Sequence, residues 1–567
     1  MTAQEYSLGL FRRHTVVLAL TLLVLLGGVM RFYRIGEPGF TEGADCMYTE
    51  TARALVLLAQ WSWENPRLLG GEGTDSVTAF FAEHAALPLV NMPYSCKPLY
   101  DLMNALAIAV AGCSDGVLPA LSALAGTWSL LAIFALGREL YGERVGLWAV
   151  ALLAVSGGGL VFSRYGQSHM VSILFFMVGF WFYLRSLKPG LSSLWALSGC
   201  SLFFGFALTT HPNLLPYVAL FLLYDLLLTF RGTLSWKVLL QRVGVGLGVM
   251  VSIGVLLNLP FQLVGYFFRP FFDRMAPQMG WPFMTYFEQL PHHFSLVVTE
   301  AAPGLQERAY TYLGVFWAWE GSVVAGLVVG SLACWFWHCK RASTNEIILY
   351  SQLVIPLMFW IFSENQAVNR FAAPTLPVAL VIAGRELDRI ASFFKDKLGC
   401  SLNLAAVVLC LLVMGFNAYN NRVVYHAHSA HKGVVAWLRA HGQSSVMVCH
   451  PRSFRFYGIS PVALSAGNLE QAHYLALYPR YLTEKERRVL PVVSGQSPAL
   501  KVVDARPGKL LEVEFMKHNL VLKLLQRLPV IGRYVAQMRS VVIENNDQRR
   551  LELYDITPLK TQIAAVL

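Results

Sequence analysis

The sequence predicts a polytopic α-helical membrane protein that carries a small basic α/β domain at its C-terminal end. Of the 567 residues, 55% are hydrophobic and only 14% are charged, whereas soluble proteins carry about 25% charged residues. Apolar runs of about 20 residues recur through the first three quarters of the chain, and such a run can cross a hydrocarbon core of about 30 Å. From Asn421 onward, 20 Lys and Arg outnumber 10 Asp and Glu. This basic tail has no nucleic-acid motif, so anionic lipid or phosphate is its expected partner.

The first apolar run, residues 14–30, predicts an uncleaved membrane anchor with a cytoplasmic N-terminus. It follows Arg12 and Arg13, and RFYR stands where a signal peptide would have a small-residue cleavage site. Ten further spans are expected at 116–136, 144–161, 169–184, 192–210, 213–230, 243–266, 310–337, 346–362, 371–384 and 402–419. The stretch 99–113 would reach only about 22 Å as a helix, so we expect it to lie in the membrane interface.

Loop charges predict the topology. If 99–113 does not cross, five loops that carry Lys or Arg all face the cytoplasm, as the positive-inside rule requires: 137–144, 185–189, 231–242, 340–344 and 384–397. The chain then crosses the plasma membrane 11 times. The predicted domains are a membrane domain, 1–420, and a soluble domain, 421–567. The soluble domain and the long first loop, 32–115, are expected on the extracytoplasmic side.

The tail has the pattern of an α/β domain with a modest core. VVAWLRAH (434–441) has the spacing of an amphipathic helix. Short runs rich in β-branched residues predict strands at 445–450, 501–505, 539–546 and 551–556.

Several motifs, in this order, resemble those of bacterial GT-C class membrane glycosyltransferases, in the group of the lipid A aminoarabinose transferases and protein O-mannosyltransferases. The motifs are RFYRIGEPGF with a following acidic loop (31–55), CKPLYDLM (96–103), the two spans around GRELYG (121–156), FSRYGQSHM (162–170), NRFAAPTLPVALVIAG (369–384) and VVAWLRAHG (434–442). The resemblance covers most of the chain. It implies a GT-C-like membrane domain and an inverting transfer of a sugar from a polyprenyl phosphate to an extracytoplasmic lipid, glycan or protein.

The acidic loop carries the expected catalytic carboxylate, which would act as general base on the acceptor. The family pattern D-E-x-x-Y-A-E-x-A-R places Asp45 at the second acidic position, and Tyr48 and Glu50 also match it. Ala44 stands at the first acidic position, which leaves Asp45 and Glu42 as alternatives. The plainer interpretation of Asp45 is a helix cap.

Other residues are expected to bind the substrates, chiefly by stabilising the leaving phosphate. The resemblance, together with their places at the outer ends of spans or helices, selects Tyr48, Glu50, Lys97, Arg164, His169, Arg308 and Arg370. Each has a plainer alternative, such as snorkelling of a cation to lipid headgroups or a structural hydrogen bond of the imidazole. The resemblance leaves the metal requirement open, and a divalent cation is one alternative.

The rival prediction is a membrane transporter or flippase for a lipid-linked saccharide. Such a protein should place charges within its spans or break its helices in pairs. The ionisable residues instead gather at one membrane face, which favours the enzyme. The sequence leaves the sugar, the acceptor, the prenyl chain length and the oligomeric state open.

Overall fold

Apolar helices dominate the computed structural model of the protein. It describes residues 3–37, 39, 43–64, 97–188, 192–267, 303–338, 342–363, 369–398, 402–426, 429–448, 451–477, 484–496, 499–504, 511, 515–529, 531–547 and 550–567.

Among these residues, nine helices are long and apolar enough to cross a membrane. They are formed by α1 (Ala3–Phe32), α5 (Val117–Tyr141), α8 (His169–Ser186), α9 (Ser192–Thr210), η3 and α10 (Pro212–Leu214, Leu215–Phe230), α11 (Trp236–Phe267), α14 (Leu305–His338), α15 (Thr344–Phe362) and α17 (Leu402–His426). A tenth crossing arises if α6 (Glu143–Ala154) and α7 (Gly157–Ser163), which are bent by 61°, count as one span.

The predicted span 371–384 corresponds to η5 (Asn369–Thr375) and the start of α16 (Leu376–Leu398). The first half of α16 is apolar and buried, but its second half carries acidic and basic side chains. The charged half shortens the apolar stretch of this helix. The number of eleven crossings therefore stays a prediction.

The break between α6 and α7 depends on small residues. The Ser156 hydroxyl caps α7 by accepting a hydrogen bond from the Gly159 amide at 2.9 Å. A Cβ at Gly157 would lie 2.4 Å from the Trp319 carbonyl oxygen of α14. Glycine is needed here because the α14 backbone approaches so closely.

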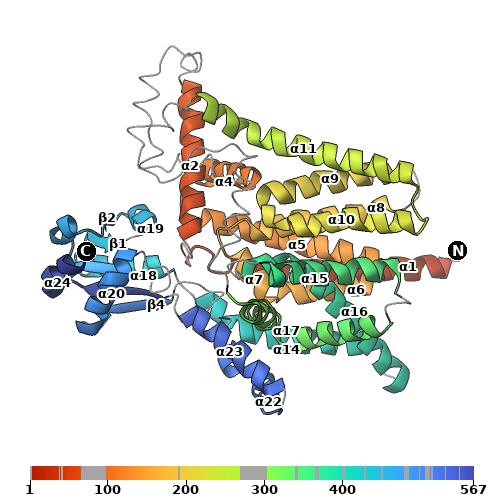
Figure 1. Ribbon diagram of the computed structural model, residues 1–567. Coiled ribbons are helices and arrows are strands. Elements are labelled where there is room, and N and C mark those ends of the chain that lie inside the picture. The colour runs from red at the N-terminus through yellow and green to blue at the C-terminus, as the bar shows by residue number, and fades with distance from the viewer. Residues whose placement is uncertain are drawn as a thin grey trace.

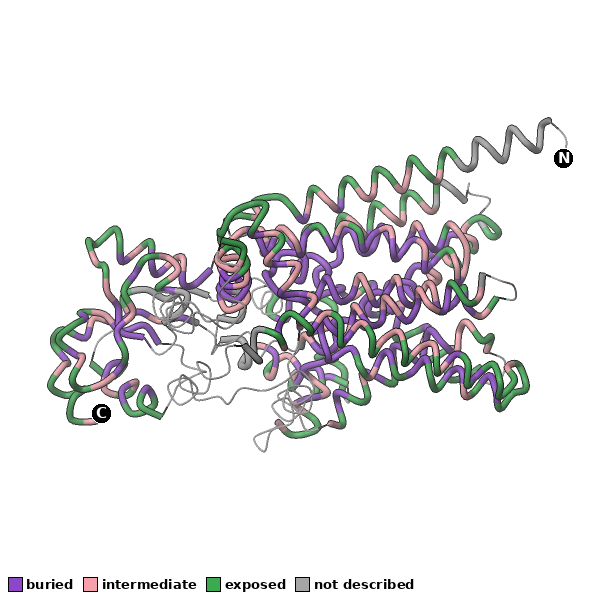
Figure 2. The backbone as a smooth tube through the Cα atoms, turned by 90° about the horizontal axis from the view of Figure 1, so that it is seen from above, coloured by how far each residue is buried: buried purple, intermediate pink, exposed green. Residues whose placement is uncertain are grey.

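The exposed apolar surfaces of α1 and α11 indicate which medium surrounds the bundle. Only 11% of the apolar stretch of α1 and 6% of that of α11 are buried. Figure 2 shows both the buried inner helices and the exposed outer ones. Because water would not favour two such apolar helices on the outside of the bundle, hydrocarbon is the solvent that suits them, and the chain is a multi-pass membrane protein.

The two ends of the bundle differ. At the end opposite the N-terminus lie α2 (Gly43–Glu64), α4 (Pro98–Ala111) and the C-terminal sheet (Figure 1). The connection between α10 and α11 lies at the N-terminal end (Figure 1). Which end faces the cytoplasm stays a prediction.

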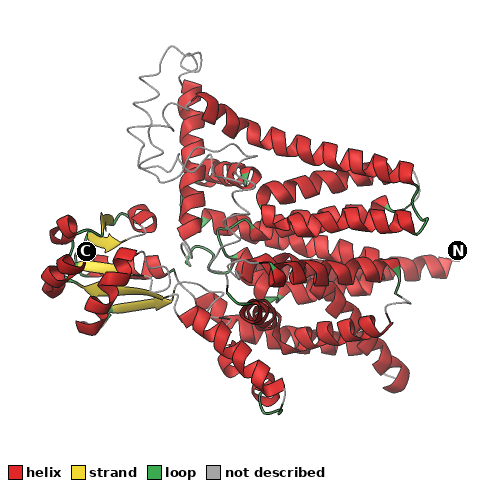
Figure 3. Cartoon of the chain, viewed as in Figure 1, coloured by secondary structure: helices red, strands yellow, loops and turns green. Residues whose placement is uncertain are grey.

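The C-terminal region forms a five-stranded mixed sheet in the order β2-β1-β3-β5-β4. Figure 3 shows its strands apart from the all-helical bundle. The strands are β1 (Ser445–Val448), β2 (Ser460–Ala463), β3 (Tyr474–Leu477), β4 (Lys501–Asp504) and β5 (Arg550–Asp555). β1 pairs in parallel with β2 and β3, while β5 runs antiparallel to β3 and β4.

Helices cover the sheet and complete this region. One apolar cluster joins the sheet to α18 (Ala430–Ala440) and α19 (Pro451–Phe456), and another joins it to α20 (Glu484–Gln496) and α24 (Lys560–Val566). The short 3-10 helices η6 (Ala466–Gln471) and η7 (Thr557–Leu559) and the helix α22 (Leu520–Leu525) complete the region. The predicted helix at 434–441 and the predicted strand at 551–556 are confirmed. The predicted strands at 445–450 and 501–505 are confirmed over 445–448 and 501–504, and their remaining residues lie outside the described part of the chain.

The predicted strand at 539–546 is wrong. This stretch is the second half of α23 (Ile531–Asp547). Val535, Met538 and Val542 share one face of the helix and pack against Ala318 of α14. The apolar period of 3.6 that begins at Val535 outweighs the β-branched run of 541–543.

Polar contacts also join the C-terminal region to the membrane part. The Asp115 carboxylate accepts hydrogen bonds from Lys432 Nζ at 3.1 Å and from the Tyr457 hydroxyl at 2.9 Å. Lys432 Nζ also donates to the Gly36 carbonyl oxygen at 3.1 Å, just beyond α1. These contacts bring the sheet next to the end of the bundle that carries α2 and α4.

Candidate active site

The contact between α2 and α4 places a cation at the end of the bundle. Lys97 is half-buried and directly precedes Pro98, the first residue of α4, a position where proline favours helix initiation. Its ammonium donates a hydrogen bond to the Tyr48 hydroxyl and lies 4.8 Å from the centre of the Tyr48 ring. Tyr48 in turn meets the Tyr100 ring edge-on at 5.3 Å. Two of the predicted substrate-binding residues, Tyr48 and Lys97, therefore touch each other.

One turn further along α4 lies a carboxyl that the sequence interpretation did not select. Asp101 is fully buried, and within the part of the chain that the structure describes neither of its side-chain oxygens has a hydrogen-bond partner. Asn104, on the same face, is also fully buried, and neither of its side-chain amide atoms has a hydrogen-bond partner among the described residues. Burial raises the pKa of the Asp101 carboxyl to about 8, against a smaller lowering by the Lys97 ammonium. A charged residue type within an apolar helix was the signal that could have identified it.

A second group of residues meets where α8, η3 and η5 begin. His169 is buried, and its Nε2 lies 2.9 Å from Oε1 of Gln167. The rings of His169 and His211 stand 4.6 Å apart, and Arg370 lines the same small cleft as both. The empty space there is about 10 Å³, which is room for one water molecule. Lys97 and Arg370 both act electrostatically on His169, so these three predicted residues belong to one neighbourhood.

Arg164 lies elsewhere, at the end of α7. Its guanidinium donates hydrogen bonds to the carbonyl oxygens of Arg31 at 3.2 Å, Tyr33 at 2.5 Å and Arg34 at 3.5 Å. It also lies 5.2 Å from the centre of the Tyr425 ring. Because three of its contacts satisfy carbonyls at the C-terminal end of α1, this cation supports the helix end.

Arg308, in the first turn of α14, has similar partners. Its Nε donates to the Ile361 carbonyl oxygen at 2.9 Å, near the end of α15, and its Nη1 donates to the Pro303 carbonyl oxygen at 2.5 Å. The arginine is buried. Its guanidinium links α14 to α15, and none of these contacts joins it to the neighbourhood of Lys97 and His169.

The predicted carboxylates are only partly described. Glu42 lies outside the described residues. Asp45 lies in the first turn of α2, but its side chain is outside the described part. Glu50 is buried on the same helix, with 7% of its surface exposed. The identity of the catalytic carboxylate and the roles of all these residues stay predictions.

Among the described residues, no group of three or more His, Cys, Asp or Glu side chains could hold a metal ion. The acidic positions 42 and 45 are not covered by this finding. A divalent cation therefore stays an expectation from the resemblance.

Comparison with known proteins supports the resemblance seen in the sequence. Residues 93–257 match the family described as dolichyl-phosphate-mannose-protein mannosyltransferase. This stretch includes Lys97, Arg164 and His169, and it covers the central motifs that suggested the GT-C class. The match confirms the resemblance to these membrane glycosyltransferases for that part of the chain. No curated protein matches the chain.

Solved structures with a similar course of the chain are distant. ArnT from Cupriavidus metallidurans bound to undecaprenyl phosphate has 11% sequence identity and a TM-score of 0.45, over 98% of this chain and 77% of that one. The apo form of the same protein has 13% identity and a TM-score of 0.44, over 79% and 75%. The apo oligosaccharyltransferase of Archaeoglobus fulgidus has 11% identity and a TM-score of 0.48, over 84% and 71%. TM-scores below 0.5 are too low to support an inference about this chain.

Proposed function

We propose that the protein is a glycosyltransferase that moves a sugar from a polyprenyl phosphate to an acceptor at the end of the bundle that carries α2 and α4. The supporting observation is the neighbourhood of Lys97, Tyr48, His169 and Arg370, of which Lys97 and His169 lie within the stretch matched by the mannosyltransferase family. Two cations at the membrane end of the bundle suit the phosphate of a lipid whose chain stays in hydrocarbon.

In this proposal the acceptor hydroxyl attacks the anomeric carbon of the sugar. A new carbon–oxygen bond forms while the bond to the phosphate oxygen breaks, and the lipid phosphate leaves with the electron pair. The hydroxyl proton passes to a carboxylate, Asp45 or Glu42, and the anomeric centre is inverted. Positions 45 and 48 lie three residues apart on α2, so they share a face of that helix. The backbone of Asp45 therefore lies close to Tyr48, whose hydroxyl accepts a hydrogen bond from the Lys97 ammonium.

The cations then divide into two roles. Lys97 and Arg370 stabilise the charge that builds on the leaving phosphate. Arg164 and Arg308 are structural in this proposal, because their guanidinium groups already bond to carbonyl oxygens at helix ends. The active end faces away from the cytoplasm, since the predicted cytoplasmic loops carry Lys or Arg.

The test is release of free lipid phosphate by the purified protein. A panel of polyprenyl-phosphate sugars is incubated with the protein and candidate acceptors, and the products are followed by mass spectrometry. Asp45→Asn is expected to abolish turnover while donor binding persists, and Lys97→Ala to weaken donor binding. Lys395→Ala is the matched control, because this lysine is exposed near the end of α16. Loss of turnover in the control alone, or full turnover in both site variants, would contradict the proposal.

A second candidate, a transporter of a lipid-linked saccharide, is favoured by one observation. Glu320 of α14 is fully buried, and its Oε1 accepts a hydrogen bond from the Ser156 hydroxyl at 2.7 Å. Two interruptions meet at this point, because Ser156 begins α7 after the bend and Gly321 interrupts α14 with a φ of 77°. Broken helices around a buried carboxylate are common in transporters. Loss of saccharide movement in Glu320→Gln, with phosphate release unchanged, would favour this candidate.

A further inference from the structure

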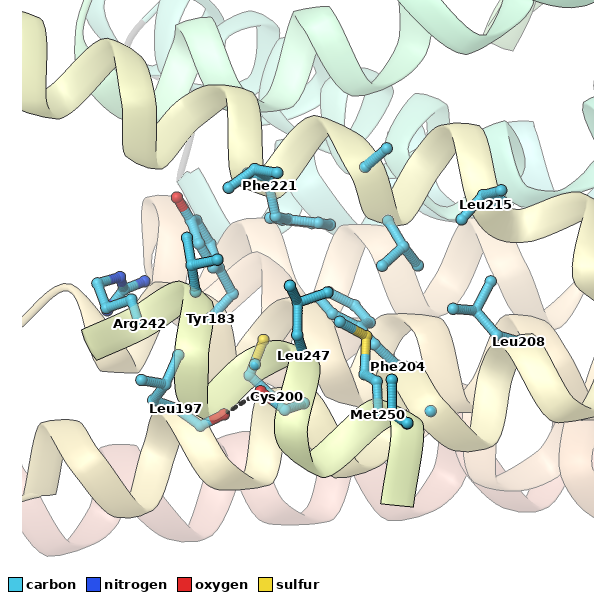
Figure 4. Close-up of a pocket in the computed structure, with 18 of the residues that line it drawn as sticks. Tyr183, Leu197, Cys200, Phe204, Leu208, Leu215, Phe221, Arg242, Leu247 and Met250 are labelled. Atoms are coloured by element: carbon cyan, nitrogen blue, oxygen red, sulfur yellow. Dashed lines mark hydrogen bonds between the residues drawn. The ribbon is translucent and has the colours of Figure 1, made fainter. Parts of the chain in front are cut away.

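A long groove runs between α9, α10 and α11, on the side of the bundle away from α14. Its cavity volume is about 380 Å³. Figure 4 shows Arg242, Tyr183 and Leu197 at one end and Leu208 and Leu215 at the other. All three helices that form it are membrane-length, so the groove lies within the depth of the bilayer.

The lining of the groove is apolar apart from one neutralised pair and the hydroxyls of Ser201 and Thr209, which donate to carbonyl oxygens of their own helix, α9. Arg242 Nε lies 2.8 Å from Asp225 Oδ2, and the arginine also donates to the hydroxyl and the carbonyl oxygen of Ser186. Oδ1 of Asp225 accepts a hydrogen bond from the Tyr183 hydroxyl at 2.9 Å. Because both charged groups are paired and hydrogen-bonded, neither requires a polar ligand. A hydrocarbon chain fits the remaining surface.

Glycines of α11 keep the groove open. Gly246 and Gly254 both line it. A Cβ at Gly254 would meet nothing within 4 Å, and one at Gly246 would meet only the Ser201 hydroxyl oxygen, at 3.7 Å. Since only 6% of the apolar stretch of α11 is buried, the groove is accessible from the surrounding lipid. The space at these positions is therefore available to a chain from the bilayer.

The end of the groove near Arg242 has the character of a headgroup zone. Phe230 and Trp236 are exposed there, with their rings edge-to-face at 5.5 Å, as in the aromatic belt of a membrane interface. Arg231 and Lys237 are exposed beside them. From Arg242 to Gly254 the helix rises about 18 Å. This length is close to one leaflet, which is half of a core of about 30 Å.

We propose that this groove binds one acyl chain of an anionic phospholipid, with the phosphate of its headgroup beside Arg231 and Lys237. The length of the groove suits a chain that ends near the bilayer midplane, and the exposed cations complement a negative headgroup. The site lies at the opposite end of the bundle from Lys97 and is independent of the proposed transfer reaction. Its failure would leave the transferase proposal untouched.

Native mass spectrometry of the detergent-solubilised protein tests the proposal. The protein is titrated with dioleoyl phosphatidylglycerol, dioleoyl phosphatidylcholine or polyprenyl phosphate. The groove is filled in the variant Gly246→Leu/Gly254→Leu, and a milder variant carries alanine at both positions. Gly248→Leu is the control, because it adds a side chain to the same helix in open space outside the groove.

We expect each protein to retain one molecule of phosphatidylglycerol and to retain phosphatidylcholine more weakly. The double leucine variant should lose retention at least about tenfold, since several buried methylenes of the lipid would be displaced. The alanine variant should lose less, and Gly248→Leu should match the wild type. Arg231→Gln/Lys237→Gln should abolish the preference for phosphatidylglycerol.

Three results would overturn the proposal. The first is unchanged retention of phosphatidylglycerol in both groove variants at an unaltered melting temperature. The second is equal retention of the two phospholipids by the wild type. The third is displacement of phosphatidylglycerol by polyprenyl phosphate, which would assign the groove to the prenyl chain instead.

Discussion

The buried Asp101 carboxyl gives a quantitative prediction about stability. Its pKa is raised from 3.8 to about 8 in the folded protein, with burial as the largest cause. A raised pKa means that the folded state holds the proton that the unfolded state releases. Stability is therefore fully present below about pH 4 and falls as the pH rises towards 8. At pH 7 the difference of about 3 pH units corresponds to at most about 4 kcal/mol.

Asp101→Asn removes this titration and keeps the shape of the side chain. Relative to the wild type, the variant should gain about 1.4 kcal/mol of stability per pH unit between pH 5 and pH 7, and less per unit as the pH approaches 8. Neither the amide nor the protonated carboxyl has a hydrogen-bond partner among the described residues. The free-energy cost of burying this polar group is therefore nearly the same in both proteins. Thermal unfolding in detergent, measured across that pH range, gives the difference.

The control is Asp396→Asn, an exposed carboxylate of α16. Its stability difference from the wild type should change little with pH. If the stability difference between Asp101→Asn and the wild type also changed little with pH, the assignment of a buried, protonated carboxyl would be refuted. A loss of stability that grows as the pH rises would refute it as well.

Three further predictions concern the structural contacts. Arg164→Gln should lower stability by about 1–3 kcal/mol, because carbonyls at the end of α1 lose their donors; unchanged melting with abolished donor binding would restore the phosphate role predicted from the sequence. Ser343→Ala removes the capping box of α15 and should cost about 1 kcal/mol in thermal unfolding without altering transfer. Asp115→Asn should weaken the contact with Lys432 and Tyr457, which limited proteolysis near 427–429 would detect as faster release of the C-terminal region.

Much of the fold could be predicted from local sequence patterns. Span-length apolar runs and the strands β1, β4 and β5 follow from hydrophobicity and period within one segment. β2 and β3 were missed because Pro461 lies within β2, and the sequence YLAL of β3 contains no β-branched residue. The stretch 539–546 was misread because its helical face is defined by contacts with α14, which is distant in the sequence.

Less of the candidate site than of the fold could be predicted from the sequence. The contact of Lys97 with Tyr48 depends on the packing of α4 against α2, although both residues were selected by their motifs. No local pattern shows that Arg164 bonds to carbonyls more than 100 residues away, or that Asp101 is buried without a partner. Burial and long-range hydrogen bonds arise only from tertiary packing, so residue type alone could not separate a structural cation from a phosphate ligand.

Release of lipid phosphate from a polyprenyl-phosphate sugar, compared between Lys97→Ala and Lys395→Ala, tests the central claim most directly. The proposed transferase should release lipid phosphate at the wild-type rate with the control and at least about a hundredfold more slowly with Lys97→Ala at low donor concentration. Equal rates in the two variants, at equal yields of folded protein, would contradict the assignment of this end of the bundle as the site of transfer.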